Sequence, residues 1–311
     1  MNKFLKYNKR DPLPDERKIS YSQFSMYSQC PKHWELAYAR NLRTFSQSIH
    51  TVFGTAMHET LQHYLTVMYN DSVKAADAID IKDYLKDQMY SIYKEAVEKM
   101  GEHFSNKFEL GEFYEDGVAI LDWFKRKRGG YFSRKNEELL GIETPIYHPV
   151  NETNDKVMML GYLDVVIRNK VTDTITIIDI KTSTRGWNKW QKADKLKAAQ
   201  LVAYKKYFSD QFGTPIDNID IEFFIVKRKL LEESMFPQKR IQLLNPASGS
   251  VTRKKIQRNI DTFIEYCFDA NGNKQKDKNY LAIAGKGAKH CKWCPFKTDY
   301  ENCPKENRIR E

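Results

Sequence analysis

The chain has 311 residues, of which 41% are hydrophobic and 13% aromatic, enough to bury one large core. Lysine and arginine number 51 against 41 aspartate and glutamate, and the net charge of +10 favours a polyanionic partner, although it also fits any basic soluble protein. No apolar run reaches about 18 residues, and residues 1–6 lack the apolar core of a signal peptide, so we expect a cytoplasmic protein without membrane spans.

The amino-terminal part of the chain predicts an arm and then helices. Residues 1–19 are polar and basic and contain two prolines, which favours an irregular arm. A short helix over 21–29 and a second one beginning at Pro31 follow, because serine caps and proline starts helices. Longer helices are predicted over about 73–100 and 110–127, where apolar residues recur at helical spacing.

Another helix is predicted over residues 52–68, where apolar residues again recur every three or four positions. His58 lies one step off this apolar stripe, and Gly54 lies one turn before it on the same side. A glycine there leaves room for a group that approaches His58. A lone histidine on a helix is more often a boundary residue than a ligand, so spacing alone leaves its role open.

Two β-rich runs, 161–167 and 174–183, are joined by the turn-rich segment 168–173, which suits neighbouring antiparallel strands. Successive side chains of a strand point to opposite faces. Asp179 and Lys181 are therefore expected on one face of the second strand.

Pairing of these strands would bring Asp164 close to Asp179. Two carboxylates held together repel each other unless a cation lies between them, and oxygen ligands suit Mg²⁺ or Mn²⁺. Lys181 would add positive charge beside a nucleophilic water, which indicates metal-assisted phosphodiester hydrolysis. The alternative is a solvent-facing Asp-Lys salt bridge, which is common and weak. Glu143, on a strand predicted over 141–147, is a candidate additional ligand.

The loop 182–192 interleaves Trp187 and Trp190 with basic residues. Exposed aromatic rings stack on unpaired bases while cations meet the backbone, as in single-strand binding. The equally weighted alternative is that one or both tryptophans cap the core. The next predicted helix, 198–208, places Gln200 and Tyr204 four residues apart on one face.

Five cysteines without a secretion signal favour metal ligation over disulfides. Cys291 and Cys294 have the Cys-x-x-Cys spacing that clamps one metal centre, and Cys303 adds a third thiol. The fourth would be Cys30, which would tie the two ends of the chain together. Cys267, on a helix predicted over 250–268, is most simply a core thiol.

Asp164 followed by Asp179-Ile180-Lys181 resembles the PD-(D/E)XK nuclease signature in its RecB-type form, Gly-x-x-Asp and then Asp-x-Lys. The resemblance implies that His58, in an upstream Gly-x-x-x-His pattern, binds Mg²⁺ or Mn²⁺ together with Asp164 and Asp179. It also implies the Ile180 carbonyl as a further ligand and Lys181 as the group that orients the water.

Two other features carry the same resemblance. Gln200 and Tyr204 match the Gln-x-x-x-Tyr motif of the RecB-like subgroup, which contacts DNA and supports the active site. Cys30 with Cys291, Cys294 and Cys303 resembles the one-plus-three layout of AddB-type and CRISPR-associated RecB-like nucleases, which implies a 4Fe-4S cluster, with zinc as the alternative.

The resemblance implies an α/β fold with a restriction-endonuclease-like core, a mixed central sheet flanked by helices, a helical amino-terminal elaboration and a cluster joining the two ends. We expect one domain over 20–311, with a helical part at about 20–135, a catalytic core at about 136–230, and a helix and cysteine cluster at about 249–304. The expected function is a metal-dependent DNA exonuclease acting on single strands or ends in recombination, repair or replication, with helicase or recombination proteins as partners. The alternative is a non-catalytic DNA-binding accessory subunit.

Overall fold

The computed structural model describes residues 17–43, 45–151, 155–231 and 234–310. Contacts between residues divide the chain into two compact units. The described part of the first unit lies within 45–145 and 162–248, and that of the second within 17–43, 146–161 and 249–310. Of the irregular arm predicted for 1–19, residues 1–16 lie outside the described ranges, and Arg17–Ser20 form strand β1. The domain boundaries predicted from the sequence stay predictions.

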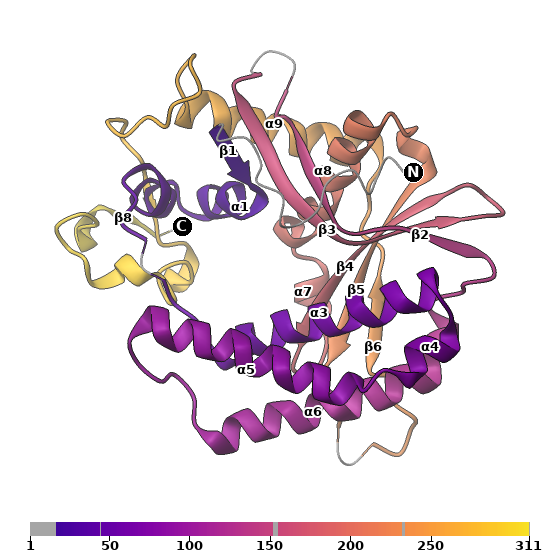
Figure 1. Cartoon of the computed structure of the whole chain (residues 1–311). Helices are drawn as coiled ribbons and strands as arrows, with labels where there is room; N and C mark the ends of the chain where they lie inside the picture. The colour runs from indigo at the N-terminus through magenta and orange to yellow at the C-terminus, as the bar shows by residue number, and fades with distance from the viewer. Residues whose placement is uncertain (1–16, 44, 152–154, 232–233, 311) are drawn as a thin grey trace. The chain divides into compact units, whose positions relative to one another are not determined.

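A mixed sheet forms the centre of the first unit (Figure 1). Its strands are β2 (Glu137–Pro149), β3 (Val157–Asn169), β4 (Ile175–Ser183), β5 (Ile219–Lys227) and β6 (Ile241–Leu244), of which β2 and β3 also contain residues of the second unit. The order is β3-β4-β5-β6, and β2 pairs with β3. Because β3–β4 and β5–β6 are antiparallel while β4–β5 is parallel, the predicted mixed sheet is confirmed.

Helices cover both sides of these strands. The helices of this unit are α3 (Ile49–Asn70), α4 (Val73–Ala78), α5 (Ile81–Met100), α6 (Lys107–Lys127), α7 (Lys189–Lys192) and α8 (Lys195–Phe212). Apolar residues of α3, α5 and α6 form one core with alternate residues of the strands, such as Ile178 and Ile180. Helix α8 packs on β4 and β5, on the side of the strands away from α3, α5 and α6 (Figure 1). The predicted arrangement of a sheet flanked by helices is therefore confirmed.

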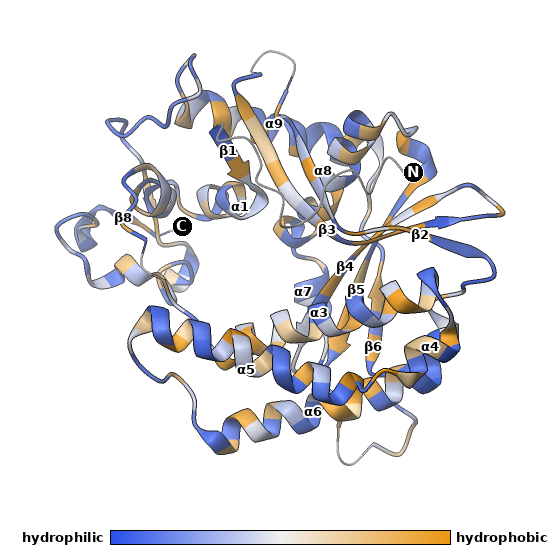
Figure 2. Cartoon of the chain, in the orientation of Figure 1, coloured by the Kyte–Doolittle hydropathy of each residue, from blue (hydrophilic) through white to orange (hydrophobic). Residues whose placement is uncertain are grey.

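Hydrophobic and hydrophilic residues alternate along α5 and α6, as expected for amphipathic helices on a core (Figure 2). The single helix predicted over 73–100 is wrong, because α4 ends at Ala78 and α5 begins at Ile81. Asp80 lies between them outside helical geometry, and its side chain accepts the N–H of Asp83 as the amino-terminal cap of α5. The apolar periodicity continues through this break. The capping residue Asp80 therefore signals the end of one helix and the start of the next, whereas the apolar pattern does not.

In the second unit, β1 pairs in parallel with Val157–Leu160 of β3. The remaining elements are α1 (Tyr21–Gln29), α2 (Pro31–Trp34), the short π-helix η2 (Glu35–Ala39), α9 (Ser250–Cys267), β7 (Ala282–Ile283), β8 (Arg308–Ile309) and short 3₁₀ helices between β7 and β8. Trp34 is fully buried and contacts the rings of Phe263, Phe268 and Tyr280. Cys267 is fully buried as well, which confirms its predicted place in a core.

Within the described ranges, no helix combines the length and the apolar character that crossing a lipid bilayer would need.

Candidate active site

Two carboxylates lie opposite each other where the β3–β4 ladder ends. The antiparallel register pairs Val165 with Ile178, so Asp164 and Asp179 occupy the next pair of positions. The ladder stops there, and the Asp164 carboxylate instead accepts the N–H of Ile180 at 2.6 Å. The predicted convergence of the two acidic residues is therefore present in the structure.

Lys181 shares a face of β4 with Asp179, as strand alternation predicts. Its ammonium lies 2.8 Å from Asp179 Oδ2, and the side chain is 34% exposed against 6% for Asp179. The lysine therefore connects a buried carboxylate with the accessible part of the site. Although the two groups are this close, Asp179 Oδ2 accepts no hydrogen bond of good geometry within the described chain.

The electrostatics of the acidic pair favour a bound cation. Burial, and next the charge of Asp179, raise the pKa of Asp164 well above its ordinary value, while Lys181 opposes the rise. Burial also raises the pKa of Asp179. Burial alone would lower the pKa of Lys181, but the two aspartates outweigh it and raise that pKa. One ammonium thus compensates two buried carboxylates incompletely, which is the charge deficit that a divalent cation offsets.

Helix α3 brings His58 to this pair, with Nδ1 3.5 Å from Asp164 Oδ2. Gly54 lies one turn earlier, where a Cβ atom would meet the hydroxyl of Thr182 at 3.1 Å. From the sequence, this glycine was expected to leave room for a group that approaches His58. In the structure it lets α3 approach the end of β4, which sets the distance between His58 and the acidic strands.

Gln62 is a residue that sequence reasoning missed. It is buried on α3, four residues after His58, and its amide nitrogen donates to Glu143 Oε1 at 2.9 Å and to the Asp164 carbonyl at 3.2 Å. Glu143 has a φ of 49°, in the left-handed region that is costly for a side-chain-bearing residue. Its charge contributes to the raised pKa of Asp164, so it belongs to the same cluster. The i, i+4 spacing from His58 was the available signal.

Gln200 and Tyr204 reach the cluster from α8. The Gln200 amide donates to the Tyr204 hydroxyl at 3.5 Å. Burial, and then the charge of Asp179, raise the pKa of Tyr204 to about 12. The structure therefore brings together all of the residues that the sequence placed at the catalytic site.

The two tryptophans after β4 differ. Trp187 is 8% exposed and packs on Phe223, with ring centroids 4.9 Å apart, whereas Trp190 is 74% exposed. One of them caps the core, and the other faces solvent.

The four predicted cysteine ligands line one cavity of about 20 Å³ in the second unit. Cys30 comes from the α1–α2 junction, and its sulfur accepts the N–H of Ile283 at 3.3 Å. Cys291, Cys294 and Cys303 come from the turns between β7 and β8. Burial raises the pKa of Cys30 and that of Cys294, and the charges of Cys291 and Cys303 contribute in both cases.

Neither cluster is a closed metal shell. Among the described residues, no group of three or more histidine, cysteine, aspartate or glutamate side chains converges tightly enough to hold a metal ion as it stands. The predicted cluster joining the ends of the chain is therefore not evident, although all four thiols line the same small cavity.

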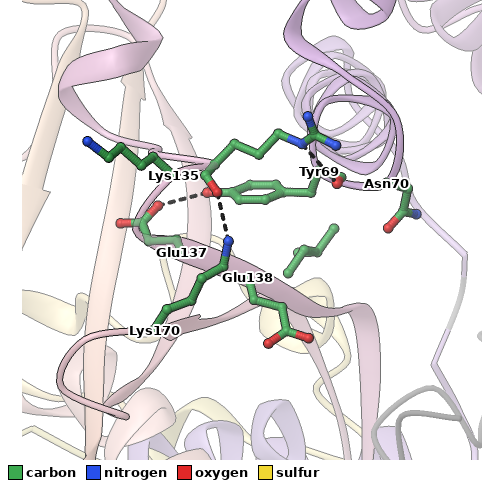
Figure 3. A pocket seen from close by; sticks show the side chains of 8 residues that line it. Tyr69, Asn70, Lys135, Glu137, Glu138 and Lys170 are labelled. Atoms are coloured by element: carbon green, nitrogen blue, oxygen red, sulfur yellow. Dashed lines mark hydrogen bonds between the residues drawn. The ribbon is translucent and has the colours of Figure 1, made fainter.

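A separate cavity of about 660 Å³ lies between the end of α3 and the start of β2 (Figure 3). Its acidic groups are already satisfied: Glu137 accepts hydrogen bonds from the Tyr69 hydroxyl and the Ser133 N–H, and Glu138 pairs with Arg168. Lys170 donates to the Arg134 carbonyl at 2.9 Å. These pairings leave no charge deficit like that of the aspartate pair, so this cavity is not the candidate active site.

A family comparison agrees with this geometry. A family model described as the PD-(D/E)XK nuclease superfamily matches residues 18–298. No curated protein matches the chain. The chain is similar to a crystal structure from Eubacterium rectale named a "Putative exonuclease", with 10% identity, a TM-score of 0.46, and coverage of 95% of this chain and 90% of that one. Because the family model spans most of the sequence and includes both acidic strands, the chain belongs to the PD-(D/E)XK nuclease superfamily.

Proposed function

We propose that this chain is a Mg²⁺- or Mn²⁺-dependent deoxyribonuclease that acts as a RecB-like exonuclease on single-stranded DNA or DNA ends. The observation that carries the proposal is the convergence of Asp164 and Asp179 beside Lys181 at the end of the β3–β4 ladder. Membership of a nuclease superfamily and a net charge of +10 support a DNA substrate.

The unsatisfied Asp179 Oδ2 atom and the charge deficit of the aspartate pair suit a divalent cation, although the described side chains do not close around one as they stand. His58, Asp164 and Asp179 would hold it, with the Ile180 carbonyl as a further ligand and Glu143 nearby. In a strand, the carbonyl and the N–H of one residue point to the same side, and the Ile180 N–H already meets Asp164. A cation bound there would stabilise charge on the phosphate and lower the pKa of a bound water.

The remaining residues supply positioning and charge. Because its pKa is raised, Lys181 keeps its ammonium protonated at neutral pH, where it donates to the attacking water and stabilises charge that develops on the phosphate. Tyr204, with a pKa of about 12, keeps its proton and acts as a neutral donor. Gln200 orients the Tyr204 hydroxyl.

For the cysteines, we propose that Cys30, Cys291, Cys294 and Cys303 bind one metal centre. The resemblance to AddB-type nucleases supports a 4Fe-4S cluster. The geometric support for a shared centre is that all four thiols line the same cavity. Iron, sulfide and zinc analysis of protein purified without oxygen separates the cluster from zinc, and protein with neither metal would overturn the proposal.

End-labelled single- and double-stranded DNA, with free or blocked ends, tests the nuclease. We expect degradation in Mg²⁺ or Mn²⁺, none with chelator, and loss of activity on the order of 10²- to 10³-fold in Lys181→Ala with DNA binding retained. Wild-type protein that binds DNA but never cuts it would instead support the non-catalytic accessory subunit, which would recruit recombination or replication proteins.

A further inference from the structure

The loop that follows the catalytic strand is fixed at Trp187. The backbone N–H of Trp187 donates to Gln242 Oε1 at 2.7 Å, and the Gln242 amide donates back to the Trp187 carbonyl at 3.2 Å. The indole packs on Phe223, so the loop is attached to both β5 and β6. One tryptophan of the pair therefore anchors the loop.

The residues on either side of this anchor are also constrained. Gly186 has a φ of +85°, and a Cβ atom there would lie 3.0 Å from Gln242 Oε1, so the tight approach needs glycine. After the anchor, the side chain of Asn188 accepts the N–H groups of Trp190 and Gln191, and Gln191 completes a capping box. The backbone of Trp190 is thus held in place.

Trp190 nevertheless presents its side chain to solvent, with 74% of its surface exposed. A single exposed apolar residue is ordinary on a protein surface. The loop differs from that ordinary case, because it buries the indole of Trp187 and exposes the indole of Trp190, three residues further on, from a backbone that is held in place. The ammonium of Lys189 lies 4.9 Å from the Trp190 ring centroid, which adds a cation to the aromatic face.

The surrounding segment is strongly basic. Residues 185–197 carry five cations, Arg185, Lys189, Lys192, Lys195 and Lys197, and one carboxylate, Asp194. Asp194 is occupied as the amino-terminal cap of α8, where it accepts the N–H groups of Leu196 and Lys197. Within the described chain, none of the five cations forms an ion pair with aspartate or glutamate. The ammonium of Lys197 lies 4.7 Å from the centroid of the buried Trp187 ring, whereas the other four side chains are exposed, so their charge is available to phosphates.

We propose that Trp190 is a stacking platform for an unpaired base of single-stranded DNA and that the cations of residues 185–197 hold the adjoining phosphates. The inference rests on the proposed nuclease function for its substrate and assigns the surface that selects unpaired strands. A duplex keeps its bases stacked inside the helix, whereas a single strand offers a base to an exposed ring.

Binding of fluorescent oligo-dT to the full chain tests this, with chelator present to prevent cleavage. Base–aromatic stacking contributes about 1–3 kcal/mol, so Trp190→Ala weakens binding roughly 5- to 140-fold, while Trp190→Phe retains most of the affinity. Tyr90→Ala is the matched control, because Tyr90 is another exposed aromatic residue, on α5, and its loss leaves binding unchanged. Affinity for blunt duplex falls much less in Trp190→Ala.

The cations give a second readout. Each phosphate contact on a single strand contributes about −0.7 to the slope of log affinity against log salt, so Lys189→Ala with Lys192→Ala reduces the slope by about 1.4. On single-stranded substrate, Trp190→Ala raises KM and preserves kcat.

Two outcomes separate this inference from the proposed nuclease function. If wild-type protein cuts DNA and Trp190→Ala binds oligo-dT like wild type, the platform is refuted and the nuclease stands. If binding depends on Trp190 and no preparation cuts DNA, the nuclease is refuted and the platform stands.

Discussion

The molecule contains two clusters of residues of the types that bind metal ions, and the two clusters are built differently. The aspartate pair of the first unit lies at the end of a strand ladder whose register fixes both residues. The cysteines of the second unit come from a helix junction and from short turns, where local bonds such as that from the Cys294 N–H to the Cys291 carbonyl set the shape. A rigid sheet holds like charges together against their repulsion, whereas turns hold neutral thiols that repel only after they ionise.

This difference predicts what each cluster does without a cation. Repulsion between the two aspartates destabilises the fold when no metal is bound, and the rest of the fold compensates for it. Removing one of the two carboxylates should therefore raise the stability of the metal-free protein. The cysteine cluster carries little such cost, so its contribution to stability should appear only when a metal is bound.

The largest expected effect is on catalysis. Asp179→Asn should lower nuclease activity on the order of 10³-fold or more, because it removes a proposed ligand and the partner of Lys181. The same change should raise the thermal midpoint of the metal-free protein, since it removes one of two repelling carboxylates. Asp87→Asn, at an exposed position on α5, should change neither quantity. An Asp179→Asn protein that is inactive and also less stable in chelator would contradict the claim that repulsion between the aspartates destabilises the metal-free fold.

The next effect concerns the second unit. Cys294→Ser should abolish the metal bound by the cysteines and lower the thermal midpoint of protein purified without oxygen, because binding of a structural metal contributes to folding stability. Cys267→Ser provides the comparison, since that thiol lies in a core away from the cysteine cavity, and should leave metal content intact. Equal metal content in Cys294→Ser and wild type would remove this cysteine from the site.

The parts of the active site whose geometry is local could be predicted from the sequence, and the others could not. Strand alternation placed Asp179 and Lys181 on one face, and the short connection placed Asp164 opposite, because both rules act within a hairpin. The Gln62–Glu143 contact joins residues 81 positions apart, and Glu143 has a positive φ. No sequence pattern signals that backbone conformation.

Gln62 allows a test of whether rigidity around the aspartate pair has a function. Gln62→Met keeps the shape of the side chain and removes its donors, so Glu143 and the Asp164 carbonyl lose a partner. We expect metal affinity, measured by Mn²⁺ titration without DNA, to fall about 10- to 100-fold. Gln211→Met is the control, since the Gln211 amide donates to the carbonyl of Pro145 on the same strand as Glu143. If Gln62→Met and Gln211→Met lose stability equally and both keep the Mn²⁺ affinity of the wild type, the role of Gln62 is purely structural.

The smallest expected effect is the pH dependence of stability. A carboxyl whose pKa is raised on folding stabilises the fold below its unfolded pKa, and that stabilisation is lost as the pH rises through the raised value. Metal-free protein should therefore lose stability as the pH rises from the ordinary carboxyl range, whereas Mn²⁺, which binds the ionised form, should restore it. The gap between midpoints with Mn²⁺ and with chelator should widen towards higher pH. In Asp179→Asn, the decline of the metal-free midpoint should shrink, because the charge of Asp179 is one cause of the raised pKa of Asp164. A gap that stays constant from acid to neutral pH would mean that the aspartates ionise without mutual cost, and the contrast between the two clusters would then fail.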